Sequence, residues 1–134
     1  MLTSVEPRVS VVVSNVHGVG EGHWQVTWIL QNDSPESLAL EAAWIPHGRF
    51  RGEGRMPLSS RVDAGGSAQL TFSVSARESP GTSVENAFLI LRANSEGHTW
   101  RIFTRMRIEF DAQAVPTPVI ELITIQKSDV SRES

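Results

Sequence analysis

The chain contains no cysteine and no tyrosine among its 134 residues, and it has no apolar run long enough to cross a membrane. The lack of cysteine excludes disulfide bonds and thiolate chemistry. Residues 1–8 lack a basic start followed by an apolar stretch, so the sequence indicates no signal peptide. These absences favour a cytoplasmic location and leave an extracellular one open.

Charge of either sign is also modest. The formal net charge is −3, which argues against a dedicated binder of nucleic acids or anionic membranes, and we expect neither partner. Hydrophobic residues make up 40% of the chain and charged residues 20%, which is typical of a globular protein. The length predicts a single domain over residues 1–134 with one hydrophobic core, frayed at 1–6 and 127–134.

Alternation of apolar and polar residues dominates the sequence. The segment 69–75 is the clearest case, with Leu70, Phe72 and Val74 on one side and polar residues on the other. Similar patterns at 8–14 and 23–32 predict strands, and 119–126 is expected to be a last strand that is apolar on both faces. A polar loop from 49 to 61 leads into an edge strand near 58–62. Glycine, proline, asparagine and aspartate mark the turns between them, including a glycine-rich turn at 18–22. The pattern predicts an all-β antiparallel sandwich of about seven to eight strands.

The segment 34–44 has features of both a helix and a strand. Ser34 is suited to a helix N-cap, Pro35 to the first helical position, and the alanine, leucine and glutamate that follow are good helix formers. The same segment alternates, with Leu38, Leu40, Ala42 and Trp44 on one side. Because the flanking segments are strands, we favour a strand and leave the helix open.

One segment carries a resemblance to a known class of domain. Residues 61–74, Arg-Val-Asp-Ala-Gly-Gly-Ser-Ala-Gln-Leu-Thr-Phe-Ser-Val, resemble a hairpin common in bacterial immunoglobulin-like and fibronectin-type domains. Residues 25–32, which end in Leu-Gln-Asn, are similar to the second strand of such domains. The chain departs from antibody-type domains because it has no cysteine pair and no tyrosine corner. The resemblance implies an immunoglobulin-like sandwich, and this architecture does not define a function.

The hairpin 86–110 has two apolar faces of different character. A two-residue turn at Glu96-Gly97 would pair Arg92 with Arg101 and Ile90 with Phe103, and it would place Leu89, Leu91, Ala93, Trp100, Ile102 and Thr104 on a core face. The other side, here called the arginine–aromatic face, consists of Phe88, Ile90, Arg92, Arg101, Phe103, Arg105 and Arg107. Aromatic residues and arginine are enriched in protein interfaces. Two alternatives stay open: the face is an interaction surface, or another strand such as 119–126 covers it.

The two arginines at 92 and 101 would repel each other across this hairpin. An acidic or aromatic group must then lie between them, and the candidates are Glu109 or an acidic partner.

Three further features were weighed as sites. His47, Arg49, Phe50 and Arg51 could form a loop that holds an anion or another acidic ligand, or a turn that Phe50 attaches to the sandwich. The four tryptophans, at positions 24, 28, 44 and 100, fall on predicted core faces, with Trp24 and Trp44 the best exceptions for stacking on a sugar. His17, Glu21 and His23 carry metal-ligand atoms, but their spacing matches no metal motif, and we expect no metal and no cofactor.

The sequence contains neither a Gly-x-Ser-x-Gly nucleophile elbow nor a His-Glu-x-x-His zinc motif, and we expect no enzymatic activity. The function favoured by the sequence is that of a non-catalytic interaction or accessory module that binds a protein partner or itself. The alternatives are a small-ligand binder, for carbohydrate or metal, and an accessory domain of a longer enzyme.

Overall fold

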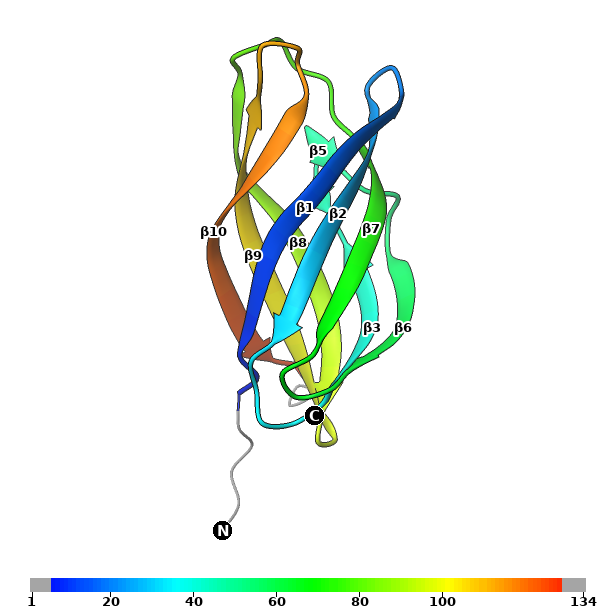
Figure 1. The fold of residues 1–134 in the computed structure, drawn as a ribbon, viewed down its shortest axis with the longest axis vertical. Coiled ribbons are helices and arrows are strands. Elements are labelled where there is room, and N and C mark those ends of the chain that lie inside the picture. Colours follow the sequence, from blue (N-terminus) through cyan, green and yellow to red (C-terminus); the bar gives the residue numbers. More distant parts are fainter. Residues whose placement is uncertain (1–5, 129–134) are drawn as a thin grey trace.

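The computed structural model describes residues 6–128, and every regular element within them is a β-strand. Ten strands form two antiparallel five-stranded sheets that pack face to face, as Figure 1 shows. The first sheet has the order β1 (Val9–Gly20), β2 (His23–Asn32), β7 (Ser67–Ser75), β5 (Phe50–Arg51) and β4 (Pro46–His47). The second has the order β10 (Pro116–Lys127), β9 (His98–Phe110), β8 (Ser83–Ser95), β3 (Leu38–Trp44) and β6 (Met56–Val62). No helix in this range could span a membrane.

The all-β antiparallel sandwich is therefore confirmed, with ten strands in place of seven or eight. The two additional strands are β4 and β5, a short hairpin that the sequence placed in a loop because each has only two residues. The segment 34–44 forms a strand from Leu38 onward and not a helix. The glycine-rich turn was predicted too long, because β1 continues to Gly20 and only Glu21 and Gly22 form the turn.

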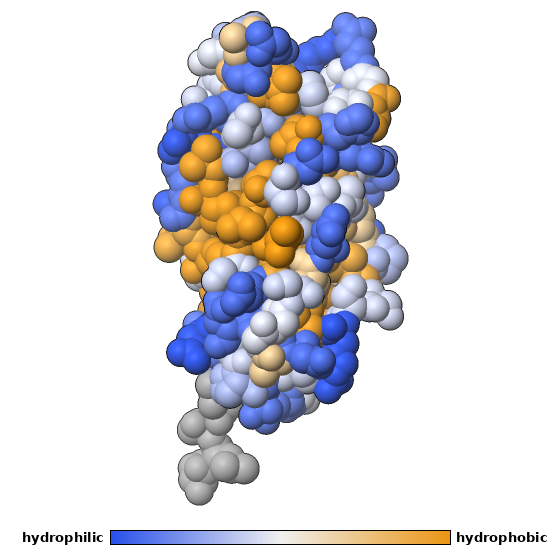
Figure 2. All heavy atoms as spheres, viewed as in Figure 1, coloured by the Kyte–Doolittle hydropathy of each residue, from blue (hydrophilic) through white to orange (hydrophobic). Residues whose placement is uncertain are grey.

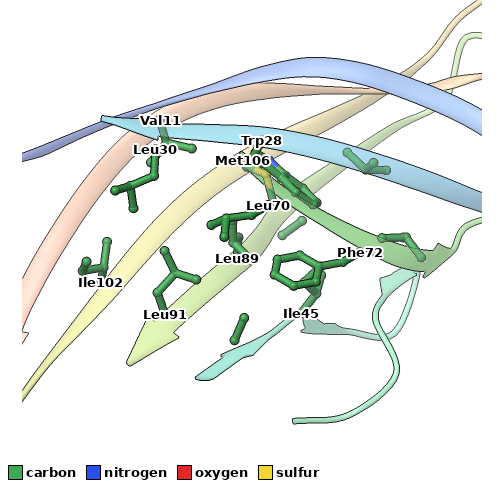
Figure 3. Close-up of a cluster of buried hydrophobic side chains, with 14 of the residues drawn as sticks. Val11, Trp28, Leu30, Ile45, Leu70, Phe72, Leu89, Leu91, Ile102 and Met106 are labelled. Atoms are coloured by element: carbon green, nitrogen blue, oxygen red, sulfur yellow. The ribbon is translucent and has the colours of Figure 1, made fainter. Parts of the chain in front are cut away.

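The core lies between the two sheets and is centred on Trp28 of β2, whose side chain is fully buried. Its ring lies 6.0 Å from that of Phe72 on β7 and 6.5 Å from that of Phe50 on β5, the latter edge-on. Leu89, Leu91, Ile102 and Met106 point into the same core from the second sheet (Figure 3). This interdigitation of large apolar side chains supplies most of the driving force for folding.

A buried asparagine fixes one end of the sandwich. The Asn32 side-chain amide donates hydrogen bonds to the backbone carbonyls of Glu36 and Val62, at 2.8 and 3.0 Å, and its Oδ1 accepts one from the Ser34 amide. Asn32 has no exposed surface, so each of these polar atoms needs its protein partner. The residue thereby connects the end of β2 to the segment before β3 and to the end of β6.

A β-bulge interrupts β3 between Leu40 and Ala42. The bulge inserts one extra residue, so the alternation of inward and outward side chains changes phase there. Leu40 and Ala43 pair with the core-facing residues Ala93 and Leu91, whereas Trp44 pairs with Ile90 on the opposite face of the sheet. The expected grouping of Leu38, Leu40, Ala42 and Trp44 on one core face is therefore wrong.

The predicted frayed ends lie mostly outside the described residues. Lys127, which the sequence assigned to the frayed C-terminal end, is instead the last residue of β10.

Candidate functional site

The arginine–aromatic face forms the outer side of the second sheet, away from the core. Its strands pair in the register that the sequence predicted, with Arg92 opposite Arg101 and Ile90 opposite Phe103. The turn at Glu96-Gly97 has φ angles of 53° and 80°, as expected for a tight two-residue hairpin turn. The residues of the face therefore come together as one surface.

Aromatic contact holds the centre of this face. The rings of Phe88 and Phe103 meet edge to face, with 6.4 Å between their centroids and an interplanar angle of 89°. Both rings are half-buried. The segment 119–126 does not cover them, because β10 pairs with the edge of β9 and extends the sheet. Leu122 of β10 lies opposite Arg105 and is 49% exposed, so it enlarges the apolar surface.

Three arginines of the face are neutralised by glutamates of the same sheet. Arg92 pairs with Glu41 at 3.1 Å, and Arg105 lies 3.8 Å from Glu121. Arg107 contacts Glu109 at 2.9 Å and Glu121 at 2.6 Å, and these carboxylates raise the pKa of Arg107, chiefly through the hydrogen bond that Arg107 donates to Glu109. Arg92 and Arg107 are thus hydrogen-bonded to glutamates of the sheet, whereas the buried Nε of Arg105 has no hydrogen-bond partner among the described residues.

The predicted repulsion between Arg92 and Arg101 is relieved differently from the sequence-based expectation. Glu41, at the β3 bulge, pairs with Arg92, while the Arg101 guanidinium lies over the Trp44 ring, 5.8 Å from its centroid. Glu109 instead pairs with Arg107. The bulge places both Glu41 and Trp44 beside the two arginines.

The tryptophans divide into two groups. Trp28 and Trp100 are buried, with 0% and 4% exposure, as expected for core residues. Trp24 and Trp44 are half-buried, and Trp24 donates its indole N–H to the Ala76 carbonyl at 2.9 Å. Placing Trp44 on the core face was wrong, because the β3 bulge puts it on the outer face beside Ile90.

The residues of the predicted anion loop have separate positions. Phe50 is fully buried and packs edge-on against Trp28. Arg49 donates two hydrogen bonds to the Glu78 carboxylate, at 2.8 and 3.1 Å, and the Arg49 amide donates to His47 Nδ1. The hydrogen bonds from Arg49 hold the pKa of Glu78 below its ordinary value. The four residues do not converge on one anion site, because Arg49 lines one cavity and Arg51 lines another.

The larger cavity, of about 340 Å³, is polar and includes Arg49, Glu78, Glu21 and Arg77. Its charges are already paired, because Arg77 forms an ion pair with Glu21 and Arg49 forms one with Glu78. The smaller cavity, of about 270 Å³, includes Trp44 and Arg51 and is here called the Trp44 pocket. Sequence reasoning missed this pocket, because it depends on the bulge in β3.

A second apolar surface lies at the edge where β1 and β10 approach each other. Figure 2 shows this patch from the side of the first sheet. Val12 is 55% exposed, and Val13, Val16, Ile120 and Ile123 are half-buried beside it. The strand β1 contains six valines and no charged residue, a signal that was readable in the sequence. An uncharged edge strand can accept another strand.

His17, Glu21 and His23 are exposed at the β1–β2 hairpin. Within residues 6–128 no group of three histidines or carboxylates is arranged to hold a metal ion.

Comparisons with protein-family models, with curated proteins and with solved structures found no significant match to this chain.

Proposed function

We propose that this immunoglobulin-like sandwich is a non-catalytic interaction or accessory module, and that it binds a protein partner or a second copy of itself through the arginine–aromatic face. The observation that carries the proposal is the apolar centre of Phe88, Ile90 and Phe103 on the outer face of the second sheet. The two rings are half-buried, Ile90 is 9% exposed, and β10 pairs beside β9 and not over them. Aromatic anchors within an arginine-rich surround are the composition that interfaces favour.

The ion pairs around this centre support the same function. Arg92 and Arg107 are hydrogen-bonded to glutamates of the same sheet, which favours fixed side-chain positions before any partner arrives. A surface that is ordered in advance loses less conformational entropy on binding. Their apolar stems also extend the area that a partner can cover.

Light scattering over a concentration series tests the self-association form of the proposal. We expect a dimer that Phe103→Arg converts to a folded monomer, because a charge at the centre of the apolar cluster has no partner to pair with. Val12→Arg, on the other sheet, is the matched control and should leave the mass unchanged. Dissociation by Val12→Arg alone would move the interface to the β1–β10 edge and contradict the proposal.

A monomer at every concentration would exclude self-association and leave the protein-partner form. That form is tested by capturing proteins from an extract of the source with wild-type and Phe103→Arg baits. Captured proteins that bind both baits equally would contradict a role for the face.

A carbohydrate-binding function is the second candidate, and the half-buried Trp44 beside a cavity favours it. A sugar that stacks on Trp44 must displace the guanidinium groups of Arg55 and Arg101 from its ring, and its binding should raise the melting temperature of the wild type. The shift should disappear in Trp44→Ala and persist in His17→Ala. An oligosaccharide panel that produces no shift would exclude this function.

A further inference from the structure

Three arginines near Trp44 differ from the other arginines of the outer face. The guanidinium groups of Arg55 and Arg101 lie over the Trp44 ring, 5.2 and 5.8 Å from its centroid, and Arg51 lines the same pocket. Within the described part of the chain, none of the three forms an ion pair, whereas Arg92, Arg105 and Arg107 each do. The Trp44 pocket is therefore a local centre of uncompensated positive charge in a protein whose net charge is −3.

The floor of this pocket is apolar and is built by a tight turn. Trp44, Ile45 and Pro46 line it, together with the backbone at Gly52 and Gly54. The Gly52 amide donates to the Ile45 carbonyl at 2.9 Å, and a Cβ atom at Gly52 would lie only 3.3 Å from Ile45 Cβ. Gly54 has a φ of +75°, a conformation that favours glycine. The glycines let the turn pack closely and carry Arg55 back over the indole.

The unpaired arginines and the apolar floor together indicate the chemistry of a ligand. Guanidinium groups that stack on an aromatic ring keep their N–H groups free at the edge, where a carboxylate can accept two hydrogen bonds. The whole pocket has a volume of about 270 Å³, which is enough for one aliphatic or aromatic side chain on its apolar floor. An inorganic anion would use the arginines and leave this floor empty.

The pocket is also continuous with the proposed interface, since Trp44 pairs with Ile90 across β3 and β8. We infer that the Trp44 pocket takes an apolar side chain from an acidic segment of a protein partner, whose carboxylates pair with Arg51, Arg55 and Arg101. This inference rests on the proposed function and names the chemistry of the partner.

Three capped peptides test the inference: Glu-Glu-Leu-Glu-Glu, its glutamine counterpart Gln-Gln-Leu-Gln-Gln, and Glu-Glu-Gly-Glu-Glu. Binding is followed by the NMR shift of the Trp44 indole N–H, assigned by comparison with Trp44→Phe. We expect the acidic leucine peptide to shift this signal, and the glutamine and glycine peptides to bind at least about tenfold more weakly, because each lacks one half of the recognition.

Matched arginine variants distinguish binding in the Trp44 pocket from unspecific attraction between opposite charges. Arg55→Gln and Arg101→Gln should each weaken binding of the acidic leucine peptide by about tenfold, the loss of one charge-assisted hydrogen bond. Arg105→Gln removes an equal charge from the same face, but from an arginine already near Glu121, and should leave binding unchanged. Equal weakening by all three variants would indicate unspecific charge attraction and would overturn the inference.

The inference is also overturned if no peptide shifts the Trp44 signal, or if the glutamine peptide binds as well as the acidic one. Its failure can be distinguished from failure of the proposed function. A partner or dimer that depends on Phe103 but not on Arg55 and Arg101 would retain the proposed function and exclude the acidic segment. If neither partner binding nor dimer formation depends on Phe103, the arginine–aromatic face is excluded as the interface.

Discussion

Arg92 and Arg101 lie directly opposite each other on β8 and β9, and two residues of β3 accommodate their charges. Glu41 accepts a hydrogen bond from Arg92 at 3.1 Å, and the Trp44 ring lies beneath Arg101. Like charges at directly opposed strand positions destabilise a sheet, so this arrangement depends on the neighbouring strand. The bulge in β3 thus stabilises the sheet, and it also places Glu41 and Trp44 on the outer face beside the two arginines.

Removing the carboxylate of Glu41 should expose this repulsion. We expect Glu41→Gln to lower the free energy of unfolding by about 0.5 kcal/mol, the usual size for a partly exposed ion pair. Urea denaturation at low salt measures the loss, and high salt should reduce it because screening weakens both the pair and the repulsion. Glu85→Gln, at an exposed position of β8 with no ion pair among residues 6–128, is the control. A loss of the same size in the control would contradict the role of Glu41.

A buried hydroxyl in the core should cost stability. Thr104 is fully buried, and its Oγ1 has no hydrogen-bond partner in the described structure. Valine has nearly the same shape and no hydroxyl to desolvate, so we expect Thr104→Val to stabilise the protein by about 1 kcal/mol. Thr27→Val is the matched control, because the Thr27 hydroxyl is hydrogen-bonded to that of Thr71 at 2.8 Å. Denaturant unfolding should show opposite signs for the two variants, and a destabilised Thr104→Val would refute the argument.

The buried amide of Asn32 should be among the most sensitive positions outside the apolar core. Asn32→Ala leaves the carbonyls of Glu36 and Val62 and the amide of Ser34 without their partner, and the last two of these hydrogen bonds are buried. We expect a loss of about 2–3 kcal/mol, as for other buried groups left unsatisfied. Thermal and urea unfolding measure the loss. Asn15→Ala, at an exposed position of β1, should change stability little, and equal effects at both positions would contradict the network.

The sequence was informative wherever a pattern is local. The register of β8 and β9 follows from the two-residue turn at Glu96-Gly97 and from alternation on both sides of it. The edge position of β6 follows from Pro57, which has no amide hydrogen to donate to a further strand. Both features depend on residues close together in the chain.

Features that depend on residues far apart in the chain could not be predicted from the sequence. The bulge at Glu41 moves Trp44 to the outer face, and alternation by itself carries no signal for such an insertion. The sequence offered a turn that Phe50 attaches to the sandwich as one alternative, and Phe50 is buried, but its contact with Trp28 carried no sequence signal. The pairing of Arg49 with Glu78 joins residues from different parts of the chain, so the sequence could not separate the paired arginines from the unpaired ones.

The pair of Arg49 and Glu78 gives a prediction for pH. Hydrogen bonds from Arg49 lower the pKa of Glu78 in the folded state, so the unfolded chain binds the proton more tightly. The contribution of the pair to stability is therefore complete above the unfolded-state pKa of Glu78 and is lost as the pH falls through the folded-state pKa. An NMR titration of the Glu78 carboxyl should show its lowered pKa in the wild type and a return to the ordinary value in Arg49→Gln. Arg77→Gln removes a charge from the same cavity, where Arg77 pairs with Glu21, and should leave the lowered pKa in place. An unchanged titration of Glu78 in Arg49→Gln would show that Arg49 does not hold this carboxylate in solution.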